Sequence, residues 1–240
     1  MAQKKTRLDF IEMKKKGEQV AWMTAYDFPM ASFIEQAGMD MILVGDSLGM
    51  VVLGYQGTIP VTMEDCISHC KAVRRGAPNT FCIGDMPFMS YQISSEEAVR
   101  NAGRFLKEAD MDAVKLEGGI RVCKQIKAIA DAGILVMGHI GLTPQSSGQL
   151  GGFKAQGRDA DSARELIKDA LAIEDVEEGF AERRRDLVLD HLDLGFAADH
   201  LVALLDRADA ADVEADGSIE LQRVAAGGGF RRAEHDADLH

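Results

Sequence analysis

Acidic residues recur in the first half of this 240-residue sequence at the places where apolar runs end. They are Asp46, Asp85 and Glu117, and Lys115 stands two positions before the last of them. Carboxylate oxygens are typical ligands of Mg²⁺, which usually takes one or two carboxylates together with water and substrate oxygens. These three acids, if the fold brings them together, would bind a divalent cation.

A cation held in this way suits chemistry on a 2-oxo acid. Chelated by the substrate oxygens, it would act as a Lewis acid and stabilise the enolate formed when the neighbouring carbon loses a proton. Lys115 would add positive charge at the developing oxyanion, and Ser47 offers a hydroxyl to the substrate carboxylate. His139 could shuttle a proton, because an unperturbed imidazole titrates near neutral pH. A histidine that is simply hydrogen-bonded at a strand end explains His139 equally well.

The elements that must position these residues are five apolar runs of strand length: Val20–Asp27, Met41–Ser47, Phe81–Pro87, Ala113–Gly119 and Leu135–Gly141. Such runs are typical of strands buried on both faces. Helical patterns lie between them, at Met30–Ala37, Met63–Arg75, Ser95–Ala109 and Arg121–Ala132. The alternation predicts an α/β fold of parallel βαβ units, and it fits a closed barrel and an open doubly wound sheet equally well.

An ionisable residue stands at or near the end of each of the five runs. In both kinds of fold, ligands bind at the carboxyl ends of the strands. Lys115 and Glu117 are two residues apart, so their side chains leave the same face of a strand, which in a barrel is the interior. For Asp27 we favour a capping or solvent-exposed role. The long loops Leu48–Thr62 and Leu142–Arg158 would border the same edge.

Composition sets further limits. Apolar residues make up 46% of the chain, enough to bury the core of one domain of barrel size. A formal net charge of −12 argues against binding to nucleic acid or to an anionic membrane. The sequence contains no apolar run of about 18 residues and no apolar stretch typical of a secretory signal near its start. These features predict a soluble, cytoplasmic protein.

The four cysteines show no pairing typical of a disulfide framework, so we expect reduced thiols. Cys66, His69 and Cys70 could in principle form a metal cluster on one helix. However, the two cysteines share a helical face with apolar neighbours, which favours buried packing.

Seven motifs resemble ketopantoate hydroxymethyltransferase, in order and at the expected spacing, over about residues 7–175. They are VGDSLGMVVLGY (Val44–Tyr55), PVTMED (Pro60–Asp65), VRRGAPN (Val73–Asn79), DMPFMSYQ (Asp85–Gln92), VKLEGG (Val114–Gly119), GHIGLTPQS (Gly138–Ser146) and GGFKAQGR (Gly151–Arg158). We rank a related barrel enzyme that makes or breaks C–C bonds next to a 2-oxo acid lower, because these motifs are narrower than that superfamily.

The resemblance implies a (β/α)₈ TIM barrel that uses Mg²⁺ to transfer a hydroxymethyl group from 5,10-methylenetetrahydrofolate to 3-methyl-2-oxobutanoate. The product would be 2-dehydropantoate (ketopantoate), in the first step of pantothenate biosynthesis. It implies metal ligation by Asp46, Asp85 and Glu117. It implies oxo-acid contacts by Asp46, Ser47, Asp85 and Lys115, and catalytic roles for Lys115 and His139. The family forms homo-oligomers, decamers in its bacterial members.

The resemblance ends near residue 175. The family would continue into a sixth strand that ends in the general-base glutamate, but the family's spacing places Arg184 at that position. Glu182 and Asp186 stand nearby in AERRRDL, which is not an apolar strand. The base is therefore not found, and the barrel is expected to be incomplete. A non-catalytic or impaired product that keeps the metal and oxo-acid site is the alternative to a working enzyme.

Composition changes at the same place. Every lysine lies at or before Lys168 and every methionine at or before Met137, whereas the tail is rich in aspartate and arginine. We infer a barrel portion over residues 1–175 and a divergent tail over 176–240, produced by a shift of reading frame near residue 176. A genuinely different C-terminal segment is the competing interpretation. Within the tail, Leu187–Leu205 has the apolar spacing of an amphipathic helix, and residues 206–240 have a disordered composition.

Overall fold

The structure is a computed structural model of the 240-residue chain, and it describes residues 4–150, 152, 154–178 and 188–193. The chain divides into two units, Met1–His200 and Leu201–His240, and all the described residues belong to the first. The predicted disordered segment 206–240 therefore lies outside the described residues. Among the described residues, no helix is long and apolar enough to cross a membrane.

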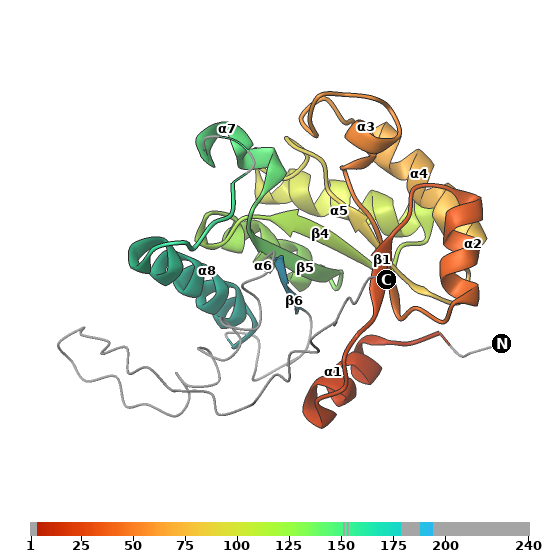
Figure 1. Cartoon of the computed structure of the whole chain (residues 1–240), viewed down its shortest axis with the longest axis horizontal. Helices are drawn as coiled ribbons and strands as arrows, with labels where there is room; N and C mark the ends of the chain where they lie inside the picture. Colours follow the sequence, from red (N-terminus) through yellow and green to blue (C-terminus); the bar gives the residue numbers. More distant parts are fainter. Residues whose placement is uncertain (1–3, 151, 153, 179–187, 194–240) are drawn as a thin grey trace, which may run out of the picture. The chain divides into compact units, whose positions relative to one another are not determined.

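The described strands form one parallel sheet whose spatial order follows the chain, β1-β2-β3-β4-β5-β6 (Figure 1). The strands are β1 (Trp22–Thr24), β2 (Met41–Val44), β3 (Phe81–Asp85), β4 (Ala113–Glu117), β5 (Leu135–Gly141) and β6 (Val188–Asp193). An open doubly wound sheet reverses its strand order partway, whereas a (β/α) barrel adds each strand beside the last. The observed strand order is therefore that of a TIM barrel. Six of the expected eight strands lie in the described residues.

All five predicted strands are confirmed, although β1 is shorter than its apolar run. The run ends at Asp27, which instead caps the next helix by accepting a hydrogen bond from the backbone N–H of Met30 at 2.8 Å. This contact confirms the capping role favoured for Asp27. It relieves one of the unpaired N–H groups of the first helical turn.

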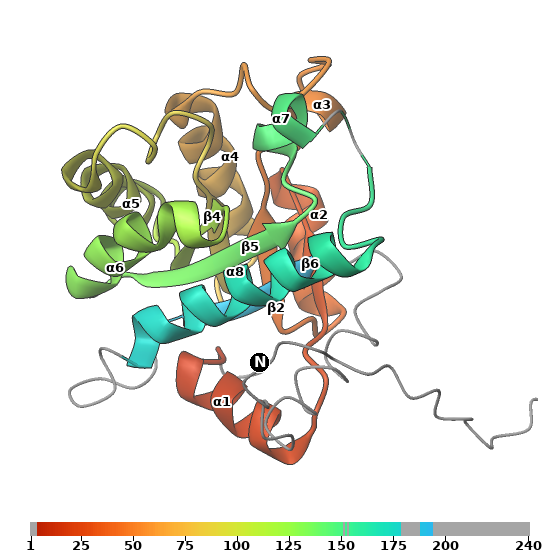
Figure 2. The ribbon, with the colours of Figure 1, turned by 90° about the vertical axis from the view of Figure 1, so that its left-hand side faces the viewer.

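The four predicted helical segments are confirmed, and the described residues contain four further α-helices that were not predicted. They are α1 (Arg7–Lys16), α2 (Phe28–Gln36), α3 (Leu48–Val51), α4 (Met63–Gly76), α5 (Ser95–Ala109), α6 (Cys123–Asp131), α7 (Ser147–Leu150) and α8 (Ala160–Glu178), with short 3₁₀ turns η1 (Ile120–Val122) and η2 (Pro144–Ser146). Ser94 caps α5 through the N–H of Glu97, and Thr62 with Asp65 forms a capping box on α4. Helix α8 packs against β5 and β6 (Figure 2).

The prediction of an amphipathic helix over Leu187–Leu205 is wrong for residues 188–193, because these residues form β6. The remaining positions of that segment lie outside the described residues. Strand β6 pairs in parallel with β5, with Val136 opposite Val188 and Gly141 opposite Asp193. The N–H and C=O groups along the free edge of β5 need partners, and pairing them outweighs a weak helical periodicity.

Side-chain alternation along the strands divides the core in two. One set of strand residues packs against α2, α4, α5 and α6, and includes Ile42, Val44, Cys82, Val114 and Val136. The other set faces the opposite side and packs around Phe10 of α1: Met41, Leu43, Phe81, Ile83, Ala113 and Met137. This second face is the barrel interior, and its alternation continues to Asp85, Lys115, Glu117 and His139.

Candidate active site

Two pairs of ionisable residues stand opposite each other across neighbouring strands. Asp85 of β3 is in register with Lys115 of β4, and Glu117 of β4 is in register with His139 of β5. All four side chains are buried. Strand pairing alone therefore gathers most of the predicted residues at the carboxyl end of the sheet, where residues directly opposite have Cβ atoms about 5 Å apart.

Lys115 lies at the centre of this cluster. Its Nζ is 3.0 Å from Asp85 Oδ2, 3.2 Å from Glu117 Oε1 and 3.3 Å from His139 Nδ1. Burial alone lowers the pKa of the Lys115 ammonium, but the negative charges of Asp85, Glu117 and Asp46 outweigh burial and raise that pKa above its ordinary value. Lys115 is therefore charged at neutral pH and beside its counter-charges.

Asp46 follows β2 and is tied to the end of the neighbouring strand β3 and to η2, which follows β5. Its backbone N–H donates to Asp85 Oδ2 at 2.8 Å, and its own Oδ2 accepts from Gln145 Nε2 at 2.9 Å. Ser47 stands beside it, with its Oγ 2.8 Å from the hydroxyl of Tyr26. The structure thus brings Asp46, Asp85, Lys115 and the residues of β4 and β5 together, with Ser47 at the next position along the chain.

His139 has a partner in the cluster in either protonation state. Its Nδ1 is 3.3 Å from the Lys115 ammonium, which can only donate, and 3.4 Å from Glu117 Oε1, which accepts when ionised. An unprotonated Nδ1 can accept from Lys115, and a protonated Nδ1 can donate to Glu117. This arrangement suits proton transfer as well as a structural role.

The cluster holds more negative than positive charge. Three carboxyl groups, Asp46, Asp85 and Glu117, surround the single ammonium of Lys115, and all are buried. Burial raises the pKa of Asp46 and raises that of Asp85 well above its ordinary value, in each case against the pull of Lys115. Burial also acts to raise the pKa of Glu117, but Lys115, His139 and the Gln145 N–H together lower it. Buried carboxylates without sufficient counter-charge are costly, so a further cation would stabilise the site.

The donor atoms fit such a cation. Asp85 Oδ1 is buried and accepts no hydrogen bond from the described residues, while Oδ2 of the same group is fully engaged. Hard carboxylate oxygens of this kind suit Mg²⁺. Within the described part of the chain, no three His, Cys, Asp or Glu residues form a ready-made metal cage, and the Lys115 ammonium contacts both Asp85 and Glu117. Asp46 and Asp85 are linked directly, by the hydrogen bond from the Asp46 N–H to Asp85 Oδ2, and the remaining ligand positions would fall to water and substrate.

Two uncharged residues of the site were not singled out from the sequence. Gln145 contacts Asp46 and Glu117, and the hydroxyl of Tyr91 contacts both Gln145 and the backbone of Glu117. Both residues lie inside motifs that carried the family resemblance. However, neither residue is charged and neither stands at the end of an apolar run.

The burial of both thiols of α4 in the hydrophobic core confirms their predicted packing role. Cys66 and Cys70 are fully buried in the core, and burial raises both pKa values well above the ordinary value. His69 turns away to the backbone carbonyl of Tyr26, with its Nδ1 at 2.5 Å. The positions at which a general base was sought, Glu182, Arg184 and Asp186, lie outside the described residues.

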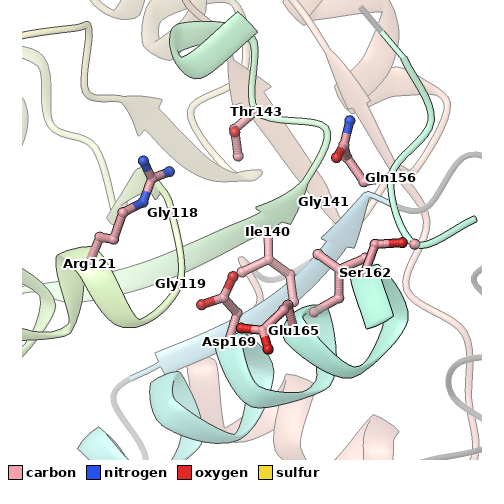
Figure 3. Close-up of a pocket in the computed structure, with 12 residues that line it drawn as sticks. Gly118, Gly119, Arg121, Ile140, Gly141, Thr143, Gln156, Ser162, Glu165 and Asp169 are labelled. Carbon is pink, nitrogen blue, oxygen red and sulfur yellow. The ribbon is translucent and has the colours of Figure 1, made fainter. Parts of the chain in front are cut away.

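A pocket of about 260 Å³ opens beside this cluster, between the ends of β4 and β5 and helix α8 (Figure 3). Arg121 lines one side, and Glu165 and Asp169 of α8 line the other. Gly118, which follows Glu117, and Ile140, which follows His139, also line it. The acidic cluster itself does not line this pocket, so the two are neighbouring features.

Comparisons with known proteins identify the family. The family model of ketopantoate hydroxymethyltransferase matches residues 4–180. A protein of Alkaliphilus metalliredigens named 3-methyl-2-oxobutanoate hydroxymethyltransferase is 77% identical over 175 residues, which are 73% of this chain and 62% of that protein. A protein of the same name from Geobacillus sp. is 61% identical over 171 residues, covering 71% of this chain and 61% of that protein. The chain thus spans about three fifths of the length of these relatives.

Solved structures show the same fold. A crystal structure of 2,3-dimethylmalate lyase, a member of the PEP mutase/isocitrate lyase superfamily, aligns with a TM-score of 0.55 at 14% identity, covering 83% of this chain and 66% of that one. At this identity the likeness concerns the fold alone. The fold, the gathered strand-end residues and the family match over residues 4–180 together show that this chain belongs to the ketopantoate hydroxymethyltransferase family.

Proposed function

We propose that the chain transfers a hydroxymethyl group from 5,10-methylenetetrahydrofolate to 3-methyl-2-oxobutanoate and so forms 2-dehydropantoate. The observation that carries this proposal is the buried cluster of Asp46, Asp85, Glu117, Lys115 and His139 at the carboxyl ends of neighbouring strands. The relatives that share 61–77% identity carry the name of this activity.

Asp46 and Asp85 would hold Mg²⁺, with Asp85 Oδ1 as the oxygen that no described hydrogen bond occupies. Glu117 would complete the acidic surroundings on the far side of Lys115. When bound, Mg²⁺ supplies a Lewis acid that withdraws electron density from the oxo group and makes the proton on C3 easier to remove.

The remaining residues act on the substrate directly. The Lys115 ammonium, fixed by Asp85 and Glu117, places a positive charge where the substrate oxygen becomes negative. Ser47, next to Asp46, offers its hydroxyl to the substrate carboxylate. His139 is placed to give or receive a proton, because both of its protonation states have a partner.

The full reaction replaces the C3 proton of the oxo acid by a hydroxymethyl group. One water molecule is consumed and tetrahydrofolate is released, so the donor methylene carbon and the water oxygen appear in the product. Assembly into a homo-oligomer and a cytoplasmic location stay predictions that follow from the family resemblance and composition.

A second candidate is a non-catalytic product that keeps the metal and oxo-acid site but cannot remove the C3 proton. It is favoured by Arg184 at the position expected for the general base and by the family match, which ends at residue 180. It agrees with our division into a barrel portion, 1–175, and a tail produced by a change of frame. Resequencing the gene past codon 170 tests the frame: a single-base correction that restores a glycine-rich barrel sequence would establish it.

Deuterium exchange separates the two candidates. The folded chain is incubated in D₂O with Mg²⁺ and 3-methyl-2-oxobutanoate but without folate, and loss of the C3 proton signal is followed by ¹H NMR. A working enzyme gives Mg²⁺-dependent exchange above the rate in buffer. Metal binding without exchange assigns the chain to the second candidate, and the absence of both contradicts the proposed site.

A further inference from the structure

Gln145, in η2 directly after β5, is a buried residue whose side-chain amide is fully hydrogen-bonded within the site. Its Nε2 group donates to Asp46 Oδ2 and to the backbone oxygen of Met86, both at 2.9 Å. Its Oε1 accepts from the hydroxyl of Tyr91 at 2.7 Å. Its backbone N–H donates to Glu117 Oε2 at 3.0 Å. One residue thus connects the ends of three strands.

These partners fix which way the amide faces. A carboxylate at Asp46 and the carbonyl of Met86 can only accept, so the NH₂ group must point to them. The Tyr91 hydroxyl donates to the amide oxygen and at the same time accepts from the backbone N–H of Glu117 at 3.1 Å. Rotating the amide by half a turn would place its oxygen against two acceptors.

The same contacts determine which carboxylate oxygens remain for other partners. Gln145 takes Oδ2 of Asp46 and Oε2 of Glu117. Oε1 of Glu117 is therefore the oxygen that faces Lys115 and His139, at 3.2 Å and 3.4 Å. The carboxylate oxygen of Asp46 that Gln145 does not contact, and that remains for another partner, is Oδ1.

We infer that Gln145, oriented by Tyr91, is a positioning residue that turns the carboxylate of Asp46 toward a divalent cation and its oxo-acid ligand. The inference rests on the proposed function of the site. Groups that orient metal ligands in this way typically change metal affinity by about 10- to 100-fold when they are removed. The inference adds a role for two uncharged residues that hold the acids without touching the reacting atoms.

Mn²⁺ binding to the full chain, followed by electron paramagnetic resonance, tests this role. Gln145→Met keeps the length of the side chain and the backbone N–H bond to Glu117 but removes the hydrogen bonds of the side-chain amide. We expect it to weaken Mn²⁺ binding about 10- to 100-fold. Tyr91→Phe keeps the ring in the core and should weaken binding less. The double variant should bind no more weakly than Gln145→Met alone, because both changes disrupt one network.

Asn101→Leu is the matched control. Asn101 donates from Nδ2 to the backbone oxygen of Ser90 at 2.7 Å, so this variant also loses an amide hydrogen bond to the loop after β3. It touches none of the acids of the cluster. We expect it to lower the denaturation midpoint and leave the Mn²⁺ dissociation constant unchanged.

Carboxyl ¹³C NMR of the metal-free chain gives a readout that does not depend on metal binding. The resonance of Asp46, which loses its hydrogen bond from Nε2, should shift in Gln145→Met, whereas that of Asp27 should not. If Gln145→Met does not fold, the same measurements on Tyr91→Phe decide. If the wild-type chain binds no Mn²⁺, the proposed function loses its metal site, and the resonances alone decide the role of Gln145. Unchanged Mn²⁺ affinity with unchanged resonances in a folded variant overturns the inference.

Discussion

The ammonium of Lys115 lies 3.0 Å from Oδ2 of Asp85, in a pair that is almost completely removed from water. The two residues are direct neighbours across β3 and β4. Asp85 thereby uses one oxygen for Lys115 and for the backbone N–H of Asp46, while none of the described residues donates a hydrogen bond to its other oxygen. This difference between the two carboxylate oxygens of Asp85 is the basis of the cation site proposed above.

Replacing Lys115 by Met should destabilise the metal-free chain strongly. Breaking a buried ion pair leaves uncompensated charge and typically costs about 3–5 kcal/mol. Lys127→Met removes an exposed pair with Asp131 and should cost no more than about 1 kcal/mol. Urea denaturation of both variants measures the difference. Equal stabilities would mean that the Lys115 pair is not buried as described.

Replacing Asp85 by Asn should remove the stabilisation that Mg²⁺ gives to the folded chain. A ligand present at 100 times its dissociation constant stabilises a protein by about 2.7 kcal/mol, and this gain should be seen for the wild type in thermal denaturation with and without Mg²⁺. Asp27→Asn is the control, because asparagine also caps a helix well and Asp27 is outside the cluster. A Mg²⁺ effect that survives in Asp85→Asn would exclude Asp85 as a ligand.

Gly84 and Gly103 should respond in opposite directions to alanine. A Cβ at Gly84 would lie 2.3 Å from the Phe105 ring, so the core must shift, at a cost of about 1–3 kcal/mol. A Cβ at Gly103, inside α5, meets nothing within 4 Å, and alanine should stabilise the helix by about 0.5–1 kcal/mol. Chemical denaturation of the two variants measures both effects. Equal changes would contradict the described packing of β3 against α5.

The buried thiols should be slow to react. Burial raises the pKa of Cys82 to about 11, so at pH 8 its protonated, unreactive form persists, and Cys66 and Cys70 are shifted in the same direction. A thiol reagent at pH 8 should label at most Cys123 quickly in the folded chain and all four cysteines in urea. Rapid labelling of more than one thiol without urea would contradict this packing.

The sequence allowed much of the site to be predicted because its charges interrupt apolar strands. Asp46, Asp85, Lys115, Glu117 and His139 each stand where an apolar run ends, and the pairing of neighbouring strands then brings them together. What remained undecided was the choice between a barrel and an open sheet, since both have the same alternation of strands and helices. Only the observed strand order decides it.

Other features depend on contacts that leave no pattern in the sequence. Gln145 lies in a polar loop, and nothing in its neighbours shows that its side-chain amide reaches Asp46 and its backbone N–H reaches Glu117. Strand β6 has a periodicity that suits a helix, and the free edge of β5 determines its conformation instead. The different contacts of the two Asp85 carboxylate oxygens likewise depend on the direction of the Lys115 side chain. Residue types alone do not determine that direction.

Uptake of Mg²⁺ in the presence of 3-methyl-2-oxobutanoate tests the central claim most directly. Isothermal titration of the folded chain should show one Mg²⁺ site whose affinity rises when the oxo acid is present, and the site should be lost in Asp85→Asn. A folded chain that takes up no Mg²⁺ with the oxo acid present would contradict the account.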